Sequence, residues 1–194
     1  DAALPLYREV HARLGEANTL QALAATDLAE GRVHASFTGF LAVREIQERD
    51  LHDALGVSGT HLFLMRVVLA AGRTQQAVAL AVPALRFYAS VEDAFDQMLV
   101  FAELARAFAE DNTERALDPA FCCWQFAIRA GDPNADALGQ LFTQVMKDSL
   151  DPGDYEHLMA DLEEHAHERV DALLAKVQAD VEAGRLDPYE VPPG

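Results

Sequence analysis

The feature that most constrains the fold is a period of 41 residues in the first half of the chain. Residues 15–32, GEANTLQALAATDLAEGR, are echoed by residues 56–73, GVSGTHLFLMRVVLAAGR, with glycine, glycine and arginine in matching places. The segments that lead into them, YREVHARLG and ERDLHDALG, match in the same register. A fixed period near 40 residues is typical of stacked helical repeats, in which each repeat buries its apolar face against its neighbours. The sequence therefore predicts an all-α fold built from helix pairs.

Apolar residues at helical spacing predict the elements of these repeats. In the first repeat, helices over residues 16–30 and 33–54 are joined at Gly31, because glycine adopts the left-handed conformation of a helix end at little cost. Gly72 stands at the same place in the second repeat. The full set of predicted helices covers residues 3–14, 16–30, 33–54, 58–71, 74–89, a stretch after the N-cap Ser90, residues 120–130, a stretch around residues 138–145, and residues 154–183.

Prolines interrupt the helical pattern at two places. Pro83 lies inside the second helix of the second repeat, where a lost hydrogen bond and a clash with the preceding turn predict a kink or an early end. Asp118-Pro119 is predicted to break the corresponding helix of the third repeat near its start. The turn before that helix has Asn112 in place of glycine, and asparagine tolerates the left-handed conformation.

Large and small side chains recur in one order along the chain. With Gly31 as the turn, the large, large, small, small and large positions of the first repeat are Leu20, Leu23, Ala24, Ser36 and Phe40. The second repeat carries the string AAGRTQQAVALAVPAL, and the third has aromatic, large, small and aromatic residues at Phe101, Leu104, Ala105 and Phe108. These segments resemble the long-period tetratricopeptide repeats of bacterial signalling proteins. The resemblance covers residues 3–130 and implies a right-handed superhelix of antiparallel helix pairs.

The resemblance also implies how the chain is organised. A partial repeat at residues 1–15 is followed by repeats at about residues 16–56, 57–90 and 91–130. The acidic residues 131–184 are expected to form a C-terminal helical cap, since a solenoid needs a final helix with a polar outer face. The proline-rich tail, residues 185–194, is expected to be extended, as a free end or as a linker.

The charge of the chain restricts its partners. It carries 15 Lys and Arg against 32 Asp and Glu, a formal net charge of −17, whereas binding to a nucleic-acid backbone needs a basic face. The sequence has no apolar run long enough to span a bilayer. We therefore expect a cytoplasmic protein with neither a nucleic-acid nor a membrane partner, in which Cys122 and Cys123 are buried free thiols.

Motifs of catalysis and metal binding are missing from the sequence. There is no G-x-S-x-G, no phosphate-binding glycine loop, no H-E-x-x-H and no C-x-x-C. His157 and His165 flank Asp161 on the last predicted helix, but the two histidines lie two turns apart, about 12 Å by helix rise, too far to share an ion alone. His11 and His52 are related by the 41-residue period, which makes them structural positions. We expect no enzyme activity, no cofactor and no metal.

The resemblance implies a concave groove lined by the first helix of each repeat. Its inward-facing residues, position by position, are Asn18 and Gln21 in the first repeat, Leu62 and Arg66 in the second, and Ala102 and Arg106 in the third. Because Arg66 and Arg106 stand at the same place in successive repeats, we expect them about 10 Å apart, the spacing of packed helices. Paired guanidinium groups select carboxylates, so an acidic peptide segment is the expected ligand.

The function implied by the resemblance is recognition of a protein or peptide, without catalysis, by a regulatory or scaffolding part of a longer polypeptide. A second interpretation is a segment that senses a small ligand and regulates an attached signalling or transcription-regulatory domain. A third interpretation is an acidic inhibitor that blocks a basic partner. Strong salt dependence of binding would be the sign of the third.

The repeat pattern also predicts how side chains pack. The small residues expected to be buried where helices meet are Ala77, Ala84 and Ala105. The first predicted helix carries an apolar stripe that lacks part of its cover, formed by Leu4, Leu6, Tyr7 and Val10. An exposed apolar stripe at the end of a solenoid favours self-association. We therefore expect copies of the chain to associate through this end.

Overall fold

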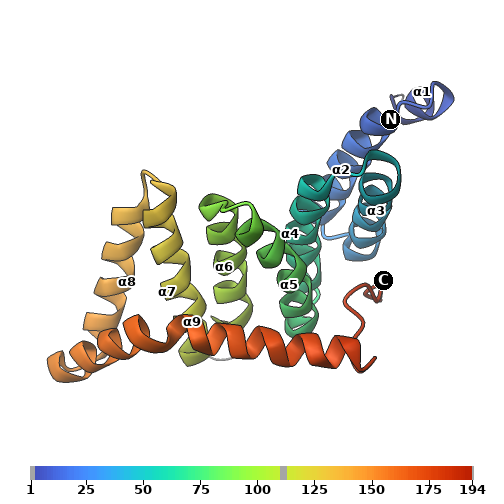
Figure 1. Cartoon of the computed structure of the whole chain (residues 1–194). Helices are drawn as coiled ribbons and strands as arrows, with labels where there is room; N and C mark the ends of the chain where they lie inside the picture. The colour runs from blue at the N-terminus through green and yellow to red at the C-terminus, as the bar shows by residue number, and fades with distance from the viewer. Residues whose placement is uncertain (1–2, 110–112, 194) are drawn as a thin grey trace. The chain divides into compact units, whose positions relative to one another are not determined.

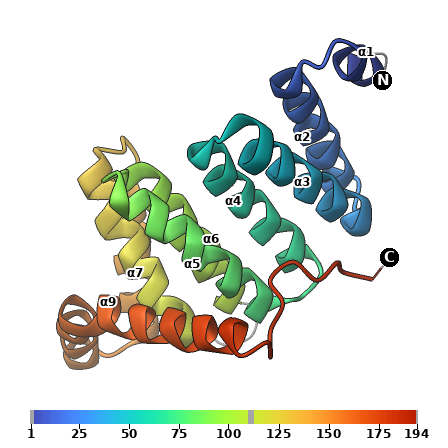
Figure 2. The same cartoon turned by 45° about the vertical axis from the view of Figure 1, so that its right-hand side comes forward.

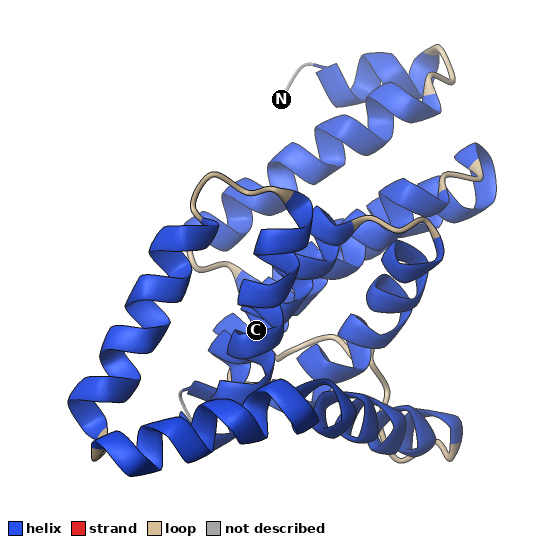
Figure 3. Ribbon diagram, turned by 60° about the vertical axis from the view of Figure 1, so that its left-hand side comes forward, coloured by secondary structure: helices blue, strands red, loops and turns tan. Residues whose placement is uncertain are grey.

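The computed structural model describes residues 3–109 and 113–193, and in this part of the chain every regular element is helical (Figure 1, Figure 3). The predicted all-α class is confirmed. In chain order the elements are α1 (Ala3–Glu9), α2 (Arg13–Ala29), α3 (Val33–Ile46), the π-helical turn η1 (Gln47–Leu51), α4 (Ala54–Ala70), α5 (Thr74–Ser90), α6 (Ala94–Ala109), α7 (Thr113–Ala130), α8 (Ala135–Ser149) and α9 (Pro152–Glu182). Among the described residues, no helix is both long enough and apolar enough to cross a membrane.

The chain forms two compact units. Unit 1 consists of residues 1–87 and 181–194, and unit 2 consists of residues 88–180. The boundary predicted between the repeats and the cap, at residues 130 and 131, lies inside unit 2. The C-terminal tail therefore belongs to the same unit as the N-terminal helices α1 to α4.

Helices of both units end in the same backbone motif at a glycine. Gly31, Gly72 and Gly131 have φ angles of 74°, 70° and 66°. After each glycine, the next residue donates its N–H to the carbonyl five positions back, at 2.8 to 3.0 Å. This Schellman motif pairs carbonyl groups that the helix end would leave open. The predicted turns at Gly31 and Gly72 are confirmed, and the turn predicted at Asn112 lies outside the described residues.

Three other turns between helices use the left-handed conformation without glycine. His11, His52 and Glu92 have φ angles of 54°, 52° and 56°, and they follow one another at intervals of 41 and 40 residues. This conformation is costly for most side chains, although histidine adopts it more often than many others. His11 and His52 thus occupy equivalent structural positions, as the sequence predicts, and Glu92 continues the series.

Two predicted helices are each divided in the structure. The helix predicted over residues 3–14 is wrong, because α1 and α2 separate at the left-handed His11. The helix predicted over residues 33–54 is also interrupted, since α3 passes into the π-helical turn η1, which ends at the left-handed His52. Apolar spacing does not report such breaks, because helical periodicity continues on both sides of them.

The N-cap residue predicted for the first helix of the third repeat, Ser90, lies too early in the sequence. Ser90 is the last residue of α5, and the carboxylate of Asp93 instead accepts the N–H of Asp96 at 3.0 Å, the geometry of an N-cap for α6. Asp53 caps α4 in the same way, through the N–H of Gly56 at 2.9 Å. Each aspartate directly follows a left-handed residue, so the two mark equivalent helix starts.

Neither internal proline ends its helix. Helix α5 continues through Pro83 and α7 continues through Pro119, so the predicted early end and the predicted break are wrong. Buried side chains follow each proline, namely Ala84 and Leu85 in α5 and Phe121 and Cys122 in α7. Burial of these side chains outweighs the cost of a proline inside a helix, about 3 kcal/mol.

Aromatic side chains join consecutive helices in the core of each unit. In unit 1, Phe37 and Phe40 of α3 are completely buried, and the ring of Phe40 stacks on Phe63 of α4 with centroids 5.0 Å apart. In unit 2, Phe101 of α6 stacks on Phe126 of α7 at 5.2 Å. These contacts hold α3 to α4 and α6 to α7.

The predicted small packing positions are confirmed in α5 and wrong in α6. Ala77 and Ala84 are completely buried, so neighbouring backbone can approach α5 closely at these positions. Ala105 of α6 is only half-buried. Its side chain instead lines an open cavity, because no large residue of a neighbouring helix fills the space beside it.

The N-terminal apolar stripe is exposed to solvent. Leu6 and Val10 each expose more than half of their surface, and Tyr7 exposes 38%. Leu4 is half-buried. Self-association through this stripe stays a prediction.

Candidate functional site

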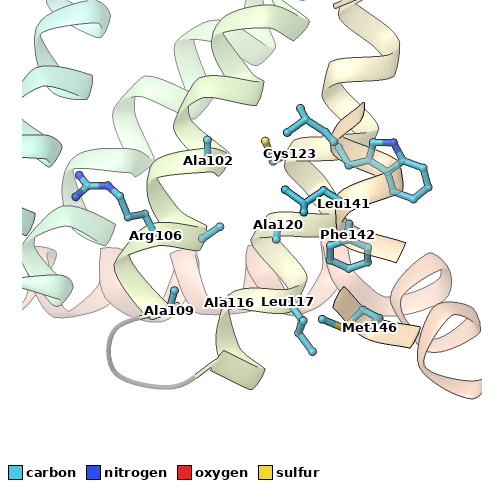
Figure 4. Close-up of a pocket in the computed structure, with 13 residues that line it drawn as sticks. Ala102, Arg106, Ala109, Ala116, Leu117, Ala120, Cys123, Leu141, Phe142 and Met146 are labelled. Atoms are coloured by element: carbon cyan, nitrogen blue, oxygen red, sulfur yellow. The ribbon is translucent and has the colours of Figure 1, made fainter. Parts of the chain in front are cut away.

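Three helices of unit 2 surround an open cavity of about 430 Å³ (Figure 4). Figure 4 shows α7 between α6 and α8, so that α6 and α8 form the sides of the cavity. The residues that line it are Ala102, Ala105, Arg106 and Ala109 of α6, Ala116, Leu117, Ala120, Cys123 and Trp124 of α7, and Leu138, Leu141, Phe142 and Met146 of α8.

Alanines create the space between these helices. Helix α6 contributes Ala102, Ala105 and Ala109, and α7 contributes Ala116 and Ala120. Residues three or four apart share one face of a helix, so each helix turns a row of methyl groups toward the cavity. A methyl group fills much less volume than leucine or phenylalanine, and the helices therefore leave a hollow where longer side chains would close it.

Larger side chains build the α8 side of the cavity. Trp124 of α7 stacks on Phe142 of α8 with centroids 6.3 Å apart, and Phe121 lies 6.2 Å from the same ring. Gly139 permits this approach, since a β-carbon there would lie 2.5 Å from Nε1 of Trp124. Leu141 exposes 63% of its surface. Helix α8 is thus fixed to α7 by aromatic rings and still presents apolar surface to water beside the cavity.

The lining suits binding of apolar groups rather than proton transfer. Among the described residues that line the cavity, Arg106 is the one charged group. Burial, and to a smaller extent the charge of Asp132, raises the pKa of the Cys123 thiol to about 11. The thiol is therefore protonated at neutral pH and is a poor nucleophile. The cavity can exclude water from an apolar ligand group.

Two of the predicted site residues, Ala102 and Arg106, line this cavity. The guanidinium of Arg106 pairs with Glu103 on the same helix, with Nη2 2.7 Å from Oε2, and Figure 4 shows it directed away from α7. Because the Arg106 side chain is 47% exposed, the pair is open to water and contributes little stability. A carboxylate of a ligand can therefore compete with Glu103 for the guanidinium.

The other predicted site residues belong to unit 1. On α2, Asn18 is exposed and Gln21 is half-buried. Leu62 of α4 is buried, which leaves little of its side chain for a ligand. Arg66 is half-buried, and its guanidinium carbon lies 5.7 Å from the ring centre of Phe63. The spacing predicted between the two arginines joins residues of different units and stays a prediction.

None of the predicted site residues lies on α8. Leu138, Leu141 and Phe142 are visible in the sequence as an apolar stripe, but such a stripe predicts a buried helix face as readily as an open one. An open helix face is distinguished from a buried one by two features together. The facing helices α6 and α7 carry small residues, and the ring of Trp124 packs against Gly139, which has no side chain. That pairing becomes evident only when α7 and α8 are placed side by side.

The acidic helix α9 is tied to α7 by an arginine. The guanidinium of Arg169 binds both carboxylate oxygens of Asp118, at 2.6 and 2.9 Å, and lies 2.9 Å from the carboxylate of Asp161. Hydrogen bonding to Arg169 lowers the pKa of Asp161, and His165 approaches the same carboxylate at 3.3 Å. Among the described residues, no cluster of histidine, cysteine and carboxylate side chains is placed to hold a metal ion.

No family model, curated protein or solved structure matches this chain. Its function is therefore inferred from its own residues. The features that bear on function are the apolar cavity of unit 2 and the contacts of the C-terminal tail in unit 1.

Proposed function

We propose that this chain is a non-catalytic recognition module that binds a protein segment in the cavity formed by α6, α7 and α8. The observation that supports this function is the lining, which is apolar apart from Arg106 and which continues into the exposed Leu138 and Leu141. Uncovered apolar surface next to a cavity is typical of a site that a partner covers. Recognition without catalysis also agrees with a protonated thiol at Cys123.

The expected occupant is a peptide segment with a large apolar side chain next to a carboxylate. The rows of alanine leave room for a side chain such as leucine or phenylalanine. On the side of α6 that faces away from α7, Arg106 can exchange its exposed contact with Glu103 for a carboxylate of a ligand that extends out of the cavity, since a guanidinium binds a carboxylate through two parallel hydrogen bonds. The net charge of −17 repels acidic segments from the rest of the surface, which adds specificity to this one position.

A tetratricopeptide-like superhelix is the arrangement that we infer for the helix pairs. It is supported by the regular alternation of two kinds of left-handed turn, with Gly31 and Gly72 inside repeats and His11, His52 and Glu92 between them. In such a superhelix the first helices of successive pairs, α6 and α8 among them, line the concave side. A crystal structure in which successive helix pairs do not stack with a constant right-handed rotation would refute the arrangement.

Selection of random peptides displayed on phage tests the proposed site. Peptides selected on the full chain should be enriched in large apolar residues next to Asp or Glu. Ala120→Leu fills the cavity from α7 and should weaken their binding about tenfold or more, equivalent to about 1.4 kcal/mol. Ala137→Leu changes an exposed alanine of α8 that does not line the cavity, and it is the matched control. Equal binding of the selected peptides to both variants would refute the site.

Sensing of a small apolar ligand is the second candidate function. It is favoured by the volume of the cavity, about 430 Å³, because small-molecule sites span roughly 300–1,000 Å³. Native mass spectrometry of the purified full chain distinguishes the two candidates. A bound small molecule that is lost in Ala120→Leu would support sensing, whereas peptide binding by a chain that carries no such molecule would support recognition of a protein segment.

A further inference from the structure

The C-terminal tail makes specific contacts with helices of unit 1. Figure 2 shows the segment after α9, in dark red, running past one end of α4. Within the described part of unit 1, the residues that contact it include His34 and Arg44 of α3, His61 of α4, Arg73 before α5, and Gln76 of α5. The hydrogen-bonded partners are 112 to 158 residues apart in the sequence. The contacts are largely polar, which is typical of recognition of a peptide rather than of burial in a core.

Gln76 binds the backbone of the tail. Its side chain is almost completely buried, and its amide nitrogen donates to the carbonyl oxygen of Pro188 at 3.0 Å and to that of Glu190 at 2.7 Å. The amide oxygen accepts a hydrogen bond from Arg73 at 3.2 Å, which orients the group. Both N–H groups of a buried amide are thus used by the tail. Without a peptide on this surface they would lose these partners, which is unfavourable for buried polar groups.

Tyr189 fills the centre of the contact. The guanidinium carbon of Arg44 lies 4.3 Å from the centre of its ring, a cation–π arrangement. Its hydroxyl oxygen lies 2.8 Å from Nε2 of His61, which is itself buried. A site built to hydrogen-bond a hydroxyl discriminates strongly against a ligand that lacks it. This surface therefore favours tyrosine over phenylalanine.

The tail forms its own turn at the point of contact. The carboxylate of Asp187 accepts the N–H of Tyr189 at 2.8 Å, and the carbonyl of Asp187 accepts the N–H of Glu190 at 3.3 Å. Pro188 supports the turn because its ring fixes φ. A segment that already holds its bound shape loses less conformational entropy on binding. The four residues Asp-Pro-Tyr-Glu thus carry the turn and the contacts with Arg44, His61, Arg73 and Gln76, while His34 contacts the carbonyl of Pro192.

We propose that the surface formed by Arg44, His61, Arg73 and Gln76 is a binding site for Asp-Pro-Tyr-Glu turns of a partner protein, and that the C-terminal tail is its intramolecular occupant. We name this surface the tail site. Tyrosine supplies the ring and hydroxyl for Arg44 and His61, and the backbone carbonyls on either side of it supply acceptors for Gln76. The tail site lies in unit 1 and does not depend on peptide binding in the cavity of unit 2.

Attachment to the chain makes the tail a strong competitor for the tail site. A tethered ligand acts at an effective concentration on the order of millimolar. A partner segment at micromolar concentration is therefore excluded while the tail is bound, even when the intrinsic affinities are equal. A substitution that weakens binding of the tail but leaves Arg44, His61, Arg73 and Gln76 unchanged should therefore make the tail site available to a partner segment.

Fluorescence anisotropy of a labelled peptide tests this proposal on the full-length chain. The probe is a synthetic peptide with the sequence of residues 185–193, RLDPYEVPP, and fluorescein at its N-terminus. The Tyr189→Ala chain should bind the probe about tenfold or more tightly than the unaltered chain, because its own tail no longer competes. Tyr155→Ala removes a half-buried tyrosine of α9 in unit 2 and is the matched control, which should bind the probe no better than the unaltered chain.

Two further measurements separate recognition from an indirect effect on folding. Gln76→Ala added to the Tyr189→Ala chain should abolish probe binding while circular dichroism shows the same helix content. A probe with phenylalanine in place of tyrosine requires no change to the protein, and the Tyr189→Ala chain should bind it about tenfold more weakly than the tyrosine probe. Equal probe binding by the unaltered and Tyr189→Ala chains, or equal binding of the two probes, would overturn the proposal.

Discussion

His61 should make the stability of unit 1 sensitive to acid. Its side chain is 4% exposed, and burial, followed by the positive charge of Arg44, lowers its pKa from the ordinary 6.5 to about 4. Its Nδ1 atom is buried and finds no hydrogen-bond partner in the part of the chain that the structure describes. A proton added to the imidazole would therefore create a buried charge that nothing compensates.

The size of the effect follows from the difference in pKa between the folded and unfolded states. Because the folded pKa is the lower one, the unfolded chain binds a proton first as the pH falls. The contribution of His61 to stability is therefore complete above about pH 6.5, decreases as the pH drops below that value, and stops decreasing below about pH 4. The expected loss in the free energy of unfolding is about 2 kcal/mol at pH 5 and about 3 kcal/mol at pH 4.

Urea unfolding followed by circular dichroism at about 222 nm, at several values between about pH 5 and pH 8, measures this loss. Trp124 is the single tryptophan and lies in unit 2, so its fluorescence does not report on unit 1. His61→Gln keeps a polar group near the hydroxyl of Tyr189 but does not titrate, and all carboxylates are common to both chains. Between pH 8 and pH 5 the unaltered chain should lose about 2 kcal/mol more than His61→Gln. Parallel pH profiles for the two chains would refute the reasoning.

Three further changes test packing and association. Ala77→Leu, at a completely buried site, should lower the free energy of unfolding by about 1–3 kcal/mol, and an unchanged denaturation midpoint would contradict the assigned packing position. Gly139→Ala forces a β-carbon against Trp124 and should change the tryptophan emission and lower the midpoint, whereas Gly153→Ala, which has open space around it, should do neither. Val10→Ser should reduce the concentration-dependent association that light scattering is expected to detect for the unaltered chain, because Val10 is among the exposed apolar residues of the N-terminal stripe. A strict monomer at high concentration would show that the stripe does not drive association.

Features that depend on a few neighbouring residues could be predicted from the sequence. Gly31 and Gly72 identify helix ends because glycine takes positive φ angles without a steric cost. Ala77 and Ala84 identify close packing because each is a small residue in a segment that is apolar on all sides. In these cases the physical cause of the structure and the sequence signal lie within the same turn of helix.

Predictions were wrong where distant contacts override a local signal. Pro83 and Pro119 weaken their helices locally, yet the buried side chains around them keep α5 and α7 continuous. The break at His11 was missed because a left-handed histidine has no strong sequence signature. The position of the tail could not be predicted at all, since Gln76 and Glu190 are 114 residues apart and no periodicity relates them.

The candidate site was predictable on one side only. The resemblance to tetratricopeptide repeats predicts Ala102 and Arg106 of α6 as ligand-facing residues, and both line the cavity. The α8 side depends on an approach between Trp124 and Gly139 that the pattern does not encode. The resemblance thus predicts two residues on the α6 side of the cavity, whereas the aromatic contacts of its α8 side are found only in the structure.

Two turns between helices show what this chain keeps constant and what it varies. His52-Asp53 and Glu92-Asp93 share the aspartate cap and the left-handed φ angle, although the left-handed residue changes from histidine to glutamate. A residue other than glycine at this angle costs about 1–2 kcal/mol, so the conformation is kept by the packing of the helices on either side rather than by residue type. The helices between such turns are then free to differ in their side chains. Unit 2 has an apolar cavity lined by alanines. Unit 1 has a polar surface on which the buried side-chain amide of Gln76 binds the backbone of the tail.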